Sequence, residues 1–190
     1  MDRRGLPVEG VQAAGLAQVN LLQGAGGVSK SVLLKAMARE MIDLQLGSMI
    51  ITAWVGVASA PFGSPTLCRL LKINHKHLRK IRNATEDEVN ALRSDFAQAA
   101  CDPEDLAVLV IDECSFLIPE IICHVDIQLR RLCDRPDTPF GGVILLLVGD
   151  FWQKSPPGGV SMAEQLVAQE VPGLAKLAAP LDPTTPGAKG

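Results

Sequence analysis

The chain has 190 residues, of which 47% are hydrophobic and 21% charged, and this composition predicts one compact α/β unit with a sizeable core. Its apolar runs are too short to cross a membrane, its first residues contain no apolar signal core, and its five cysteines include no C-x-x-C pair. We therefore expect an intracellular protein with reduced, mostly buried thiols, whose net charge of −3 does not by itself indicate nucleic-acid binding.

The first predicted elements are a short buried strand at residues 19–23 and a helix at residues 32–40, after an N-terminal extension over residues 1–16. Apolar residues recur at helical spacing in the second segment and predict its buried face: Val32, Leu33, Ala36 and Met37. A strand that passes through a glycine-rich turn into a helix points backbone N–H groups and a helix N-terminus at an anion.

The turn between these elements, GAGGVSKS, fits the phosphate-loop pattern G-x-x-x-x-G-K-[S/T] with one departure, because Ser29 occupies the place of the second glycine. In such a loop Lys30 would reach the β- and γ-phosphates of a nucleotide, and the Ser31 hydroxyl would ligate Mg²⁺. The candidate nucleotide-binding residues are the whole loop: Gly24, Ala25, Gly26, Gly27, Val28, Ser29, Lys30 and Ser31. The alternative is a glycine-rich turn that only joins a strand to a helix.

A basic segment follows between Arg69 and Arg82, where six lysine or arginine residues occur with two histidines and no acidic residue. Such a cluster would neutralise phosphates and give salt-sensitive, sequence-independent binding of single strands. Trp54 and Phe62, earlier in the chain, would add base stacking. The alternative is a solvated helix face together with a core tryptophan.

Two later apolar strands end in polar residues. Residues 106–111 lead into Asp112 and Glu113, and residues 143–148 lead into a Gly-Asp pair and then Gln153. Open α/β sheets place their ligand crevice at the carboxyl ends of the strands. There Asp112 would hold Mg²⁺, Glu113 would orient and deprotonate a water, and the Gln153 amide would sense a γ-phosphate. Ordinary strand-to-loop exits are the alternative.

Helices are predicted before and after residues 106–111. Thr85 and Glu88 form a capping box ahead of a helix whose apolar positions are Val89, Leu92 and Phe96. A second helix is marked by apolar residues at helical spacing, namely Ile118, Ile122, Val125, Leu129 and Leu132. Residues 159–190 are expected to hold a last short helix and a tail that is disordered by composition.

Taken together, these motifs resemble the first motor domain of the petite-integration-frequency (PIF-type) DNA helicases, superfamily-one motors related to RecD. The resemblance covers residues 17–158 and rests on GAGGVSKS, TAWVGVAS from Thr52, IDECSF from Ile111, and PFGG with GDFWQ from Pro139. It implies a RecA-like P-loop NTPase domain, that is, a mostly parallel sheet with helices on both faces. The chain departs from the family pattern at several positions: Ser29, Trp54, Val55, Ser64, Cys68 and Lys154.

The resemblance implies an ATP-dependent DNA helicase motor of the nucleus or mitochondrion, acting in DNA repair, recombination and telomere maintenance. Lys30, Glu113 and Gln153 would be catalytic, and Ser31 and Asp112 would be the metal ligands. Contacts to single-stranded DNA would come from Thr52, Gly56, Phe62, Thr66, Arg69, Lys76, Arg79 and Lys80.

The family's second motor domain, which supplies an arginine finger, and its strand-separating pin are not recognised in these 190 residues. We therefore expect a fragment whose second motor domain is supplied elsewhere. A non-catalytic nucleotide- or DNA-binding remnant and an adaptor without any ligand are the alternatives.

Overall fold

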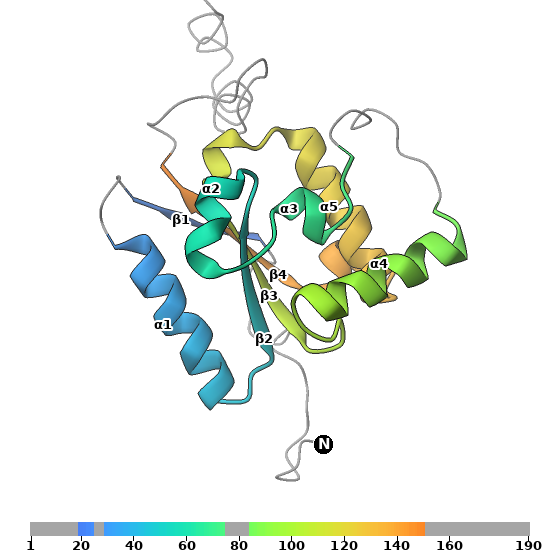
Figure 1. The fold of residues 1–190 in the computed structure, drawn as a ribbon, viewed down its shortest axis with the longest axis horizontal. Helices are drawn as coiled ribbons and strands as arrows, with labels where there is room; N and C mark the ends of the chain where they lie inside the picture. The colour runs from blue at the N-terminus through green and yellow to red at the C-terminus, as the bar shows by residue number, and fades with distance from the viewer. Residues whose placement is uncertain (1–18, 25–28, 75–83, 151–190) are drawn as a thin grey trace, which may run out of the picture.

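A parallel sheet in the order β1-β4-β3-β2 forms the centre of the structure (Figure 1). The computed structural model describes residues 19–24, 29–74 and 84–150. Within these residues the sheet has four strands, which are β1 (Val19–Gln23), β2 (Ser48–Ala53), β3 (Leu106–Asp112) and β4 (Ile144–Gly149). The strands predicted at residues 19–23, 106–111 and 143–148 are confirmed, with shifts of at most one residue at their ends.

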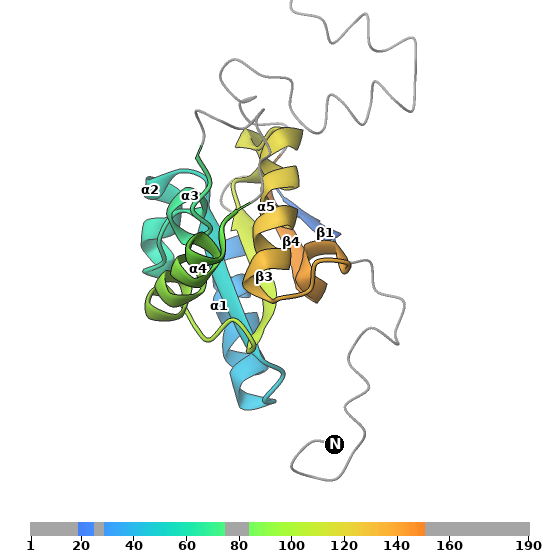
Figure 2. The same cartoon turned by 90° about the vertical axis from the view of Figure 1, so that its right-hand side faces the viewer.

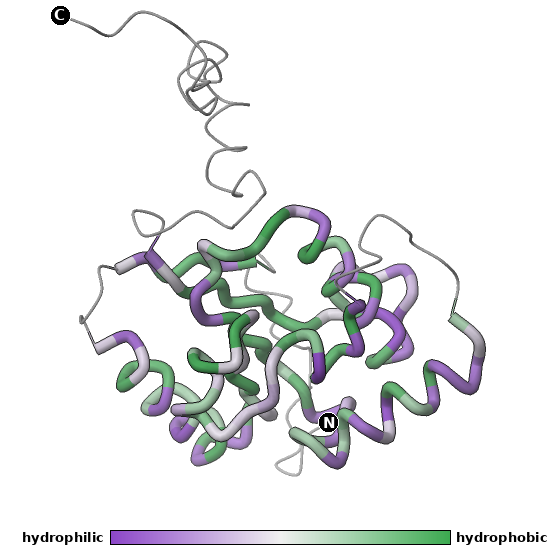
Figure 3. The backbone as a smooth tube through the Cα atoms, turned by 45° about the horizontal axis from the view of Figure 1, so that its top comes forward, coloured by the Kyte–Doolittle hydropathy of each residue, from purple (hydrophilic) through white to green (hydrophobic). Residues whose placement is uncertain are grey.

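β3 and β4 lie in the middle of the sheet and are buried on both faces, as expected for central parallel strands. In β3 the side chains of Leu109 and Ile111 enter one core, whereas Val110 between them enters the other. Figure 3 shows hydrophobic residues concentrated in the strands at the middle of the molecule, while α4 (Glu86–Ala99) alternates between hydrophilic and hydrophobic residues. Hydrophobic burial therefore holds the sheet between two covering layers.

Helices cover both faces of the sheet, as the sequence predicts (Figures 1 and 2). On one face lies α1 (Lys30–Asp43), whose Leu34 packs in a small core with Ile51 and Val110. The other face is covered by α4 together with α3 (Leu67–Leu70) and α5 (Pro119–Leu132), which Figure 2 shows on the side of the sheet away from α1. The short α2 (Gly56–Ser59) follows β2, and the 3₁₀ turn Ala60–Phe62 follows α2.

The predicted buried face of α1 is wrong. Val32 and Leu33 are 68% and 47% exposed, and Ala36 and Met37 are exposed as well. The face that meets the sheet instead carries Leu34 with two partly buried residues, Ala38 and Met41. Leu34, Ala38 and Met41 also have helical spacing, so apolar residues surround much of the helix. The spacing of apolar residues therefore does not by itself show which face is buried. Packing of Leu34 against Ile51 and Val110 of the sheet selects it.

The two predicted helices around β3 are confirmed. The Glu88 N–H donates to Thr85 Oγ1 at 3.3 Å and the Thr85 N–H donates to Glu88 Oε2 at 3.0 Å, which completes the capping box of α4. In α5 the expected apolar positions Val125, Leu129 and Leu132 are buried. The first turn differs, because Ile121 is buried where Ile122 was predicted and Ile118 is the N-cap residue.

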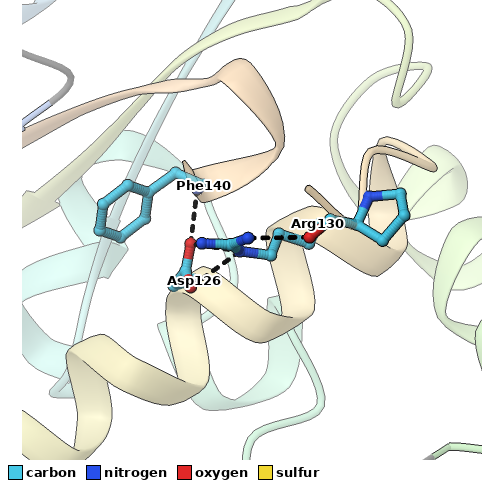
Figure 4. A network of polar contacts seen from close by, with 4 residues as sticks. Asp126, Arg130 and Phe140 are labelled. Carbon is cyan, nitrogen blue, oxygen red and sulfur yellow. Dashed lines mark hydrogen bonds and ion pairs between the residues drawn. The ribbon is translucent and has the colours of Figure 1, made fainter. Parts of the chain in front are cut away.

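The PFGG segment, Pro139–Gly142, is a 3₁₀ turn that is bound to α5 just before β4 (Figure 4). Asp126 of α5 accepts hydrogen bonds from the Phe140 backbone N–H and from Arg130 Nε, the second at 2.9 Å. Arg130 also donates to the Pro136 carbonyl at 2.8 Å. These bonds fix where β4 begins.

The thiols are free, as expected, but fewer are buried than predicted. Cys114 is buried, Cys123 is exposed, and the three others are half-buried. Burial raises the pKa of the Cys114 thiol to about 12, so this group is an inert part of the core at neutral pH. Within the described part of the chain, no helix has the length and apolar character that crossing a membrane requires.

Candidate nucleotide-binding site

The predicted site residues leave the sheet side by side at the carboxyl ends of three adjacent strands. Gln23 of β1 is in register with Gly149 of β4, and Ile111 of β3 with Leu147 of β4. The Gly24 N–H donates to the Gly149 carbonyl at 3.2 Å and continues this pairing into the loop. The start of the loop, the end of β4 and the acidic pair after β3 therefore share one edge, where ligands of parallel sheets bind.

Lys30 is the first residue of α1 and lies over the start of the loop. Its Nζ donates to the Gly24 carbonyl at 2.6 Å. The Ser29 carbonyl accepts hydrogen bonds from the Val32 and Leu33 N–H groups at 3.0 and 3.1 Å and starts the helix. The ammonium group and the positive end of the helix thus point to the same place, as a phosphate site requires. Residues 25–28 of the predicted loop lie outside the described residues.

Ser29 has the backbone conformation that the glycine of the pattern would favour. Its φ and ψ are 58° and 24°, in the left-handed region, and its side chain makes no capping hydrogen bond to α1. A non-glycine residue pays about 1 kcal/mol or more for this conformation. The departure from the pattern therefore falls on a residue whose backbone geometry suits glycine.

The acidic pair is held at the end of β3 by its own backbone. Asp112 is 8% exposed, and its Oδ1 accepts a hydrogen bond from the Glu113 N–H at 2.9 Å. Glu113 has a φ of 55°, which turns the chain sharply out of the strand. Burial raises the pKa of Glu113, and the negative charges of Asp112 and Asp150 raise it further, whereas the Lys30 ammonium opposes them. Asp112, Asp150 and Lys30 are therefore close enough to Glu113 to affect its titration.

Asp150 is a member of the site to which the sequence reasoning assigned no role. It follows β4 directly, is 8% exposed, and contributes to the raised pKa of Glu113. The sequence pattern could have identified Asp150, since it follows an apolar strand in the same way that Asp112 does. The neighbouring Gly149 permits the close approach of the two strand ends, because a Cβ there would lie 2.9 Å from Cys114 Sγ.

The residues at this edge fit a magnesium–nucleotide complex. Mg²⁺ bound with a nucleotide takes one or two carboxylates and completes its shell with phosphate oxygens and water. Asp112 supplies a nearly buried carboxylate, and Ser31 supplies a hydroxyl in the first turn of α1. Among the described residues there is no cluster of three or more acidic, histidine or cysteine side chains that would hold a metal without a nucleotide.

The candidate DNA-binding residues do not all lie on one surface. Gly56 and Thr66 are neighbours, since a Cβ on Gly56 would lie 3.8 Å from Thr66 Cγ2. Arg69 is exposed on α3, which begins after Thr66. Thr52, in contrast, is fully buried, and its hydroxyl donates to the Pro65 carbonyl at 2.7 Å. It positions the Thr66 segment and is not placed to contact DNA itself.

The aromatic candidates are both packed. Phe62 lies against the core beneath α1, and Lys35 Nζ stands 5.6 Å from the centre of its ring. Trp54 packs partly buried against the main core, which favours the reading of a core tryptophan. In the basic segment, Lys72 pairs with Asp95 at 2.6 Å. Four other candidates lie outside the described residues: Lys76, Arg79, Lys80 and Gln153.

A lysine at the start of a helix, beside acidic residues at the ends of adjacent parallel strands, defines a RecA-like P-loop NTPase domain. The family model for PIF1-like helicases matches residues 8–168, so the chain belongs to this family.

Known proteins are similar over about 70% of this chain. The ATP-dependent DNA helicase RRM3 of Saccharomyces cerevisiae is 31% identical over 134 residues, which are 70% of this chain and 18% of that protein. The ATP-dependent DNA helicase PIF1 of Trypanosoma brucei brucei is 30% identical over 132 residues, which are 68% of this chain and 12% of that protein. The chain thus spans less than a fifth of the length of these relatives.

Solved structures of Pif1 helicases are also similar to this chain. Bacteroides Pif1 bound to single-stranded DNA superposes with a TM-score of 0.54 at 25% identity, over 80% of this chain and 32% of that one. Pif1 from Bacteroides sp. in complex with ADP-AlF4 gives a TM-score of 0.55 at 25% identity over the same shares of the two chains.

Proposed function

We propose that this chain is a motor region of an ATP-dependent DNA helicase, which binds Mg²⁺-ATP at the carboxyl edge of its sheet and couples hydrolysis to single-stranded DNA. The observation that carries the proposal is the placement of Lys30 at the start of α1, bonded to Gly24 and within electrostatic reach of Glu113. Similar proteins are named ATP-dependent DNA helicases, and similar structures hold single-stranded DNA or ADP-AlF4.

Lys30 would stabilise charge on the phosphates. Its ammonium would exchange the Gly24 carbonyl for phosphate oxygens and keep the favourable field of the helix N-terminus. Asp112 and Ser31 would hold Mg²⁺, which when bound neutralises negative charge on the phosphates.

Glu113 would act as the general base. Burial and the negative charges of Asp112 and Asp150 raise its pKa, which makes the carboxylate a stronger proton acceptor. It would take a proton from the attacking water, and Gln153 would sense the γ-phosphate.

The DNA interface would follow Gly56, Thr66 and Arg69 and continue into the basic segment with Lys76, Arg79 and Lys80. A second motor domain would close the nucleotide site and supply an arginine finger. By its resemblance to the family, the protein would work in the nucleus or mitochondrion, in DNA repair, recombination and telomere maintenance.

A non-catalytic remnant is the second candidate function, and the left-handed backbone of Ser29 favours it. A strained phosphate loop would bind the nucleotide weakly and hydrolyse it slowly.

Calorimetric titration with ATP, with and without Mg²⁺, tests the proposal. We expect Mg²⁺-dependent binding by the parent chain, no binding by Lys30→Ala, and unchanged binding by Lys35→Ala, which removes an exposed lysine further along the same helix. Glu113→Gln should bind ATP and lose phosphate release in the presence of single-stranded DNA. If the parent chain binds no ATP, only the alternative of an adaptor without a ligand remains. If it binds ATP but shows no hydrolysis, it is the non-catalytic remnant.

A further inference from the structure

A groove of about 480 Å³ runs along the outer edge of β2, away from the nucleotide-binding residues. β2 is the terminal strand of the sheet, and among the described residues its outer edge pairs with no other strand. Figure 1 shows β2 in front, with α1 to its left. An edge strand presents unpaired backbone N–H and C=O groups, to which another chain can bind as an added strand.

The outer edge of β2 contributes to the lining of this groove. Three consecutive residues, Met49, Ile50 and Ile51, line it. Side chains of consecutive strand residues point to opposite faces of the sheet, so a groove lined by all three must lie over the edge of the strand. Its walls come from both faces, with Ile42 of α1 on one side and Ala99 at the end of α4 on the other.

The groove is apolar but carries positive charge along one wall. Lys35 and Arg39 are exposed and stand one turn apart on α1, and they are the charged residues among the described lining. No described acidic side chain lines the groove, although the chain as a whole has a net charge of −3. The complementary ligand is therefore apolar and negatively charged.

A peptide fits these features better than a nucleic acid does. Bases stack on open aromatic faces, whereas the lining of this groove is mainly aliphatic. Its one described aromatic residue is Phe62, over whose ring the Lys35 ammonium already stands. An extended peptide would instead pair with the β2 edge and place alternate side chains on the two sides of the sheet.

We propose that this groove is a docking site for an extended acidic–apolar peptide of a partner protein, which adds a strand to β2 and directs carboxylates to Lys35 and Arg39. The site is separate from Lys30 and Asp112, so a partner bound there would leave the nucleotide edge accessible. This inference goes beyond the proposed ATP- and DNA-binding functions and does not depend on them.

Fluorescence anisotropy with a labelled (Val-Glu)₃ peptide tests the charge requirement on the full chain. We expect saturable binding at low salt, weakened by roughly tenfold or more in Lys35→Glu/Arg39→Glu, because like charges then face each other. A (Val-Lys)₃ peptide should show the reverse preference and bind the double variant better than the parent chain. The urea unfolding midpoint of the double variant should match that of the parent, which checks that the fold is intact without relying on ATP binding. Equal binding of both peptides to the parent chain would overturn the proposal.

Two N-methylated forms of (Val-Glu)₃ test the strand pairing without changing the protein. One carries methyl groups on the amides of one peptide edge, and the other on the amides of the opposite edge. A strand added in one direction pairs through one edge only, so one form should lose binding and the other should keep it, and a third form methylated on both edges should lose binding whatever its direction. Retention by the form methylated on both edges would exclude strand addition. Displacement of the peptide by a single-stranded oligothymidine that depends on Lys35 and Arg39 would assign the groove to nucleic acid and likewise overturn the proposal.

Discussion

Single residues set the properties of the nucleotide edge through backbone conformation and local charge. Ser29 and Glu113 both have left-handed backbones, with φ of 58° and 55°, and each stands next to a residue proposed to contact the nucleotide or its metal. Such conformations are costly for residues with a Cβ and persist where the surroundings hold them. Ser29 therefore offers a test of backbone strain, and Glu113 a test of local charge.

Replacing Ser29 with glycine should relieve backbone strain in the phosphate loop. We expect Ser29→Gly to tighten Mg²⁺-ATP binding and to raise the free energy of unfolding by about 1 kcal/mol. Ser29→Ala is the matched control, since it removes the hydroxyl but keeps the Cβ at positive φ, and it should show neither gain. Calorimetric titration and urea unfolding measure the two effects. Equal affinity of the parent and Ser29→Gly would mean that the loop tolerates serine, and the remnant would lose its main support.

The raised pKa of Glu113 predicts a pH-dependent effect on stability. A carboxyl group whose pKa is higher in the folded state stabilises the fold while protonated, and this contribution is lost as the pH rises through the folded-state pKa. Glu113→Gln, which is neutral at every pH, should therefore gain stability over the parent at pH 7 and show little difference below the ordinary glutamate pKa. Urea midpoints of both proteins at a series of pH values provide the measurement. A gain that is the same at all pH values would contradict the assigned cause.

At the scale of elements, the turn at Pro139–Gly142 decides how β4 enters the sheet. Phe140 has a φ of 51° and Gly141 a φ of 62°, and the Asp126 carboxylate binds the Phe140 N–H. Gly141 is packed against α5, so that a Cβ there would lie 2.5 Å from the Leu129 carbonyl oxygen. The PFGG pattern thus has a structural reason, because the turn must pass close to the helix backbone before the strand begins.

Two glycines with the same backbone conformation separate strain from steric overlap. Gly63 has a φ of 66° but nothing within 4 Å of an added Cβ, whereas Gly141 has both the positive φ and the overlap with Leu129. We expect Gly63→Ala to cost about 1 kcal/mol of unfolding free energy and Gly141→Ala roughly 3 kcal/mol or more. Chemical denaturation of the two variants gives the comparison. Similar losses would show that the turn moves away from α5 at little cost.

For the whole molecule, the match to less than a fifth of the length of its relatives bears on activity. A motor that separates strands needs two lobes closing around ATP, and the loss of an arginine finger costs on the order of a thousandfold in rate. Expressed as these 190 residues, the chain should hydrolyse ATP very slowly and unwind no duplex. A forked-duplex unwinding assay on the purified monomer checks this. Robust unwinding would overturn the role proposed for a second domain.

DNA binding should depend on salt if the basic segment follows the path of the strand. Replacing Lys76, Arg79 and Lys80 with alanine should weaken binding of single-stranded DNA at low salt and flatten the dependence of affinity on salt, because fewer counterions are released. Lys72→Ala serves as a comparison, since its ammonium already pairs with Asp95, and it should change the slope less. An unchanged slope in the triple variant would leave the segment as a solvated face.

The sequence by itself was sufficient for β1, β3 and β4 and for the central part of the site, whereas the edge strand β2 was not predicted. Central parallel strands are buried on both faces and therefore appear as continuous apolar runs. A phosphate loop is made of consecutive residues, so Gly24 and Lys30 are recognisable without knowledge of distant contacts. The meeting of Asp112 with the loop was also predictable, because parallel strands end at one edge of a sheet.

Only the tertiary structure decided the features that depend on which distant residues pack together. The buried side of α1 is the one that carries Leu34, because that side packs against Ile51 of β2 and Val110 of β3. Phe62 lies beneath Lys35 and Thr52 is buried, because the segment after α2 folds back over β2. The groove at the β2 edge is lined by residues of α1, β2 and α4, and no local sequence pattern predicts it. Burial is a property of the packed layers, whereas the apolar runs and the phosphate loop are properties of the local chain.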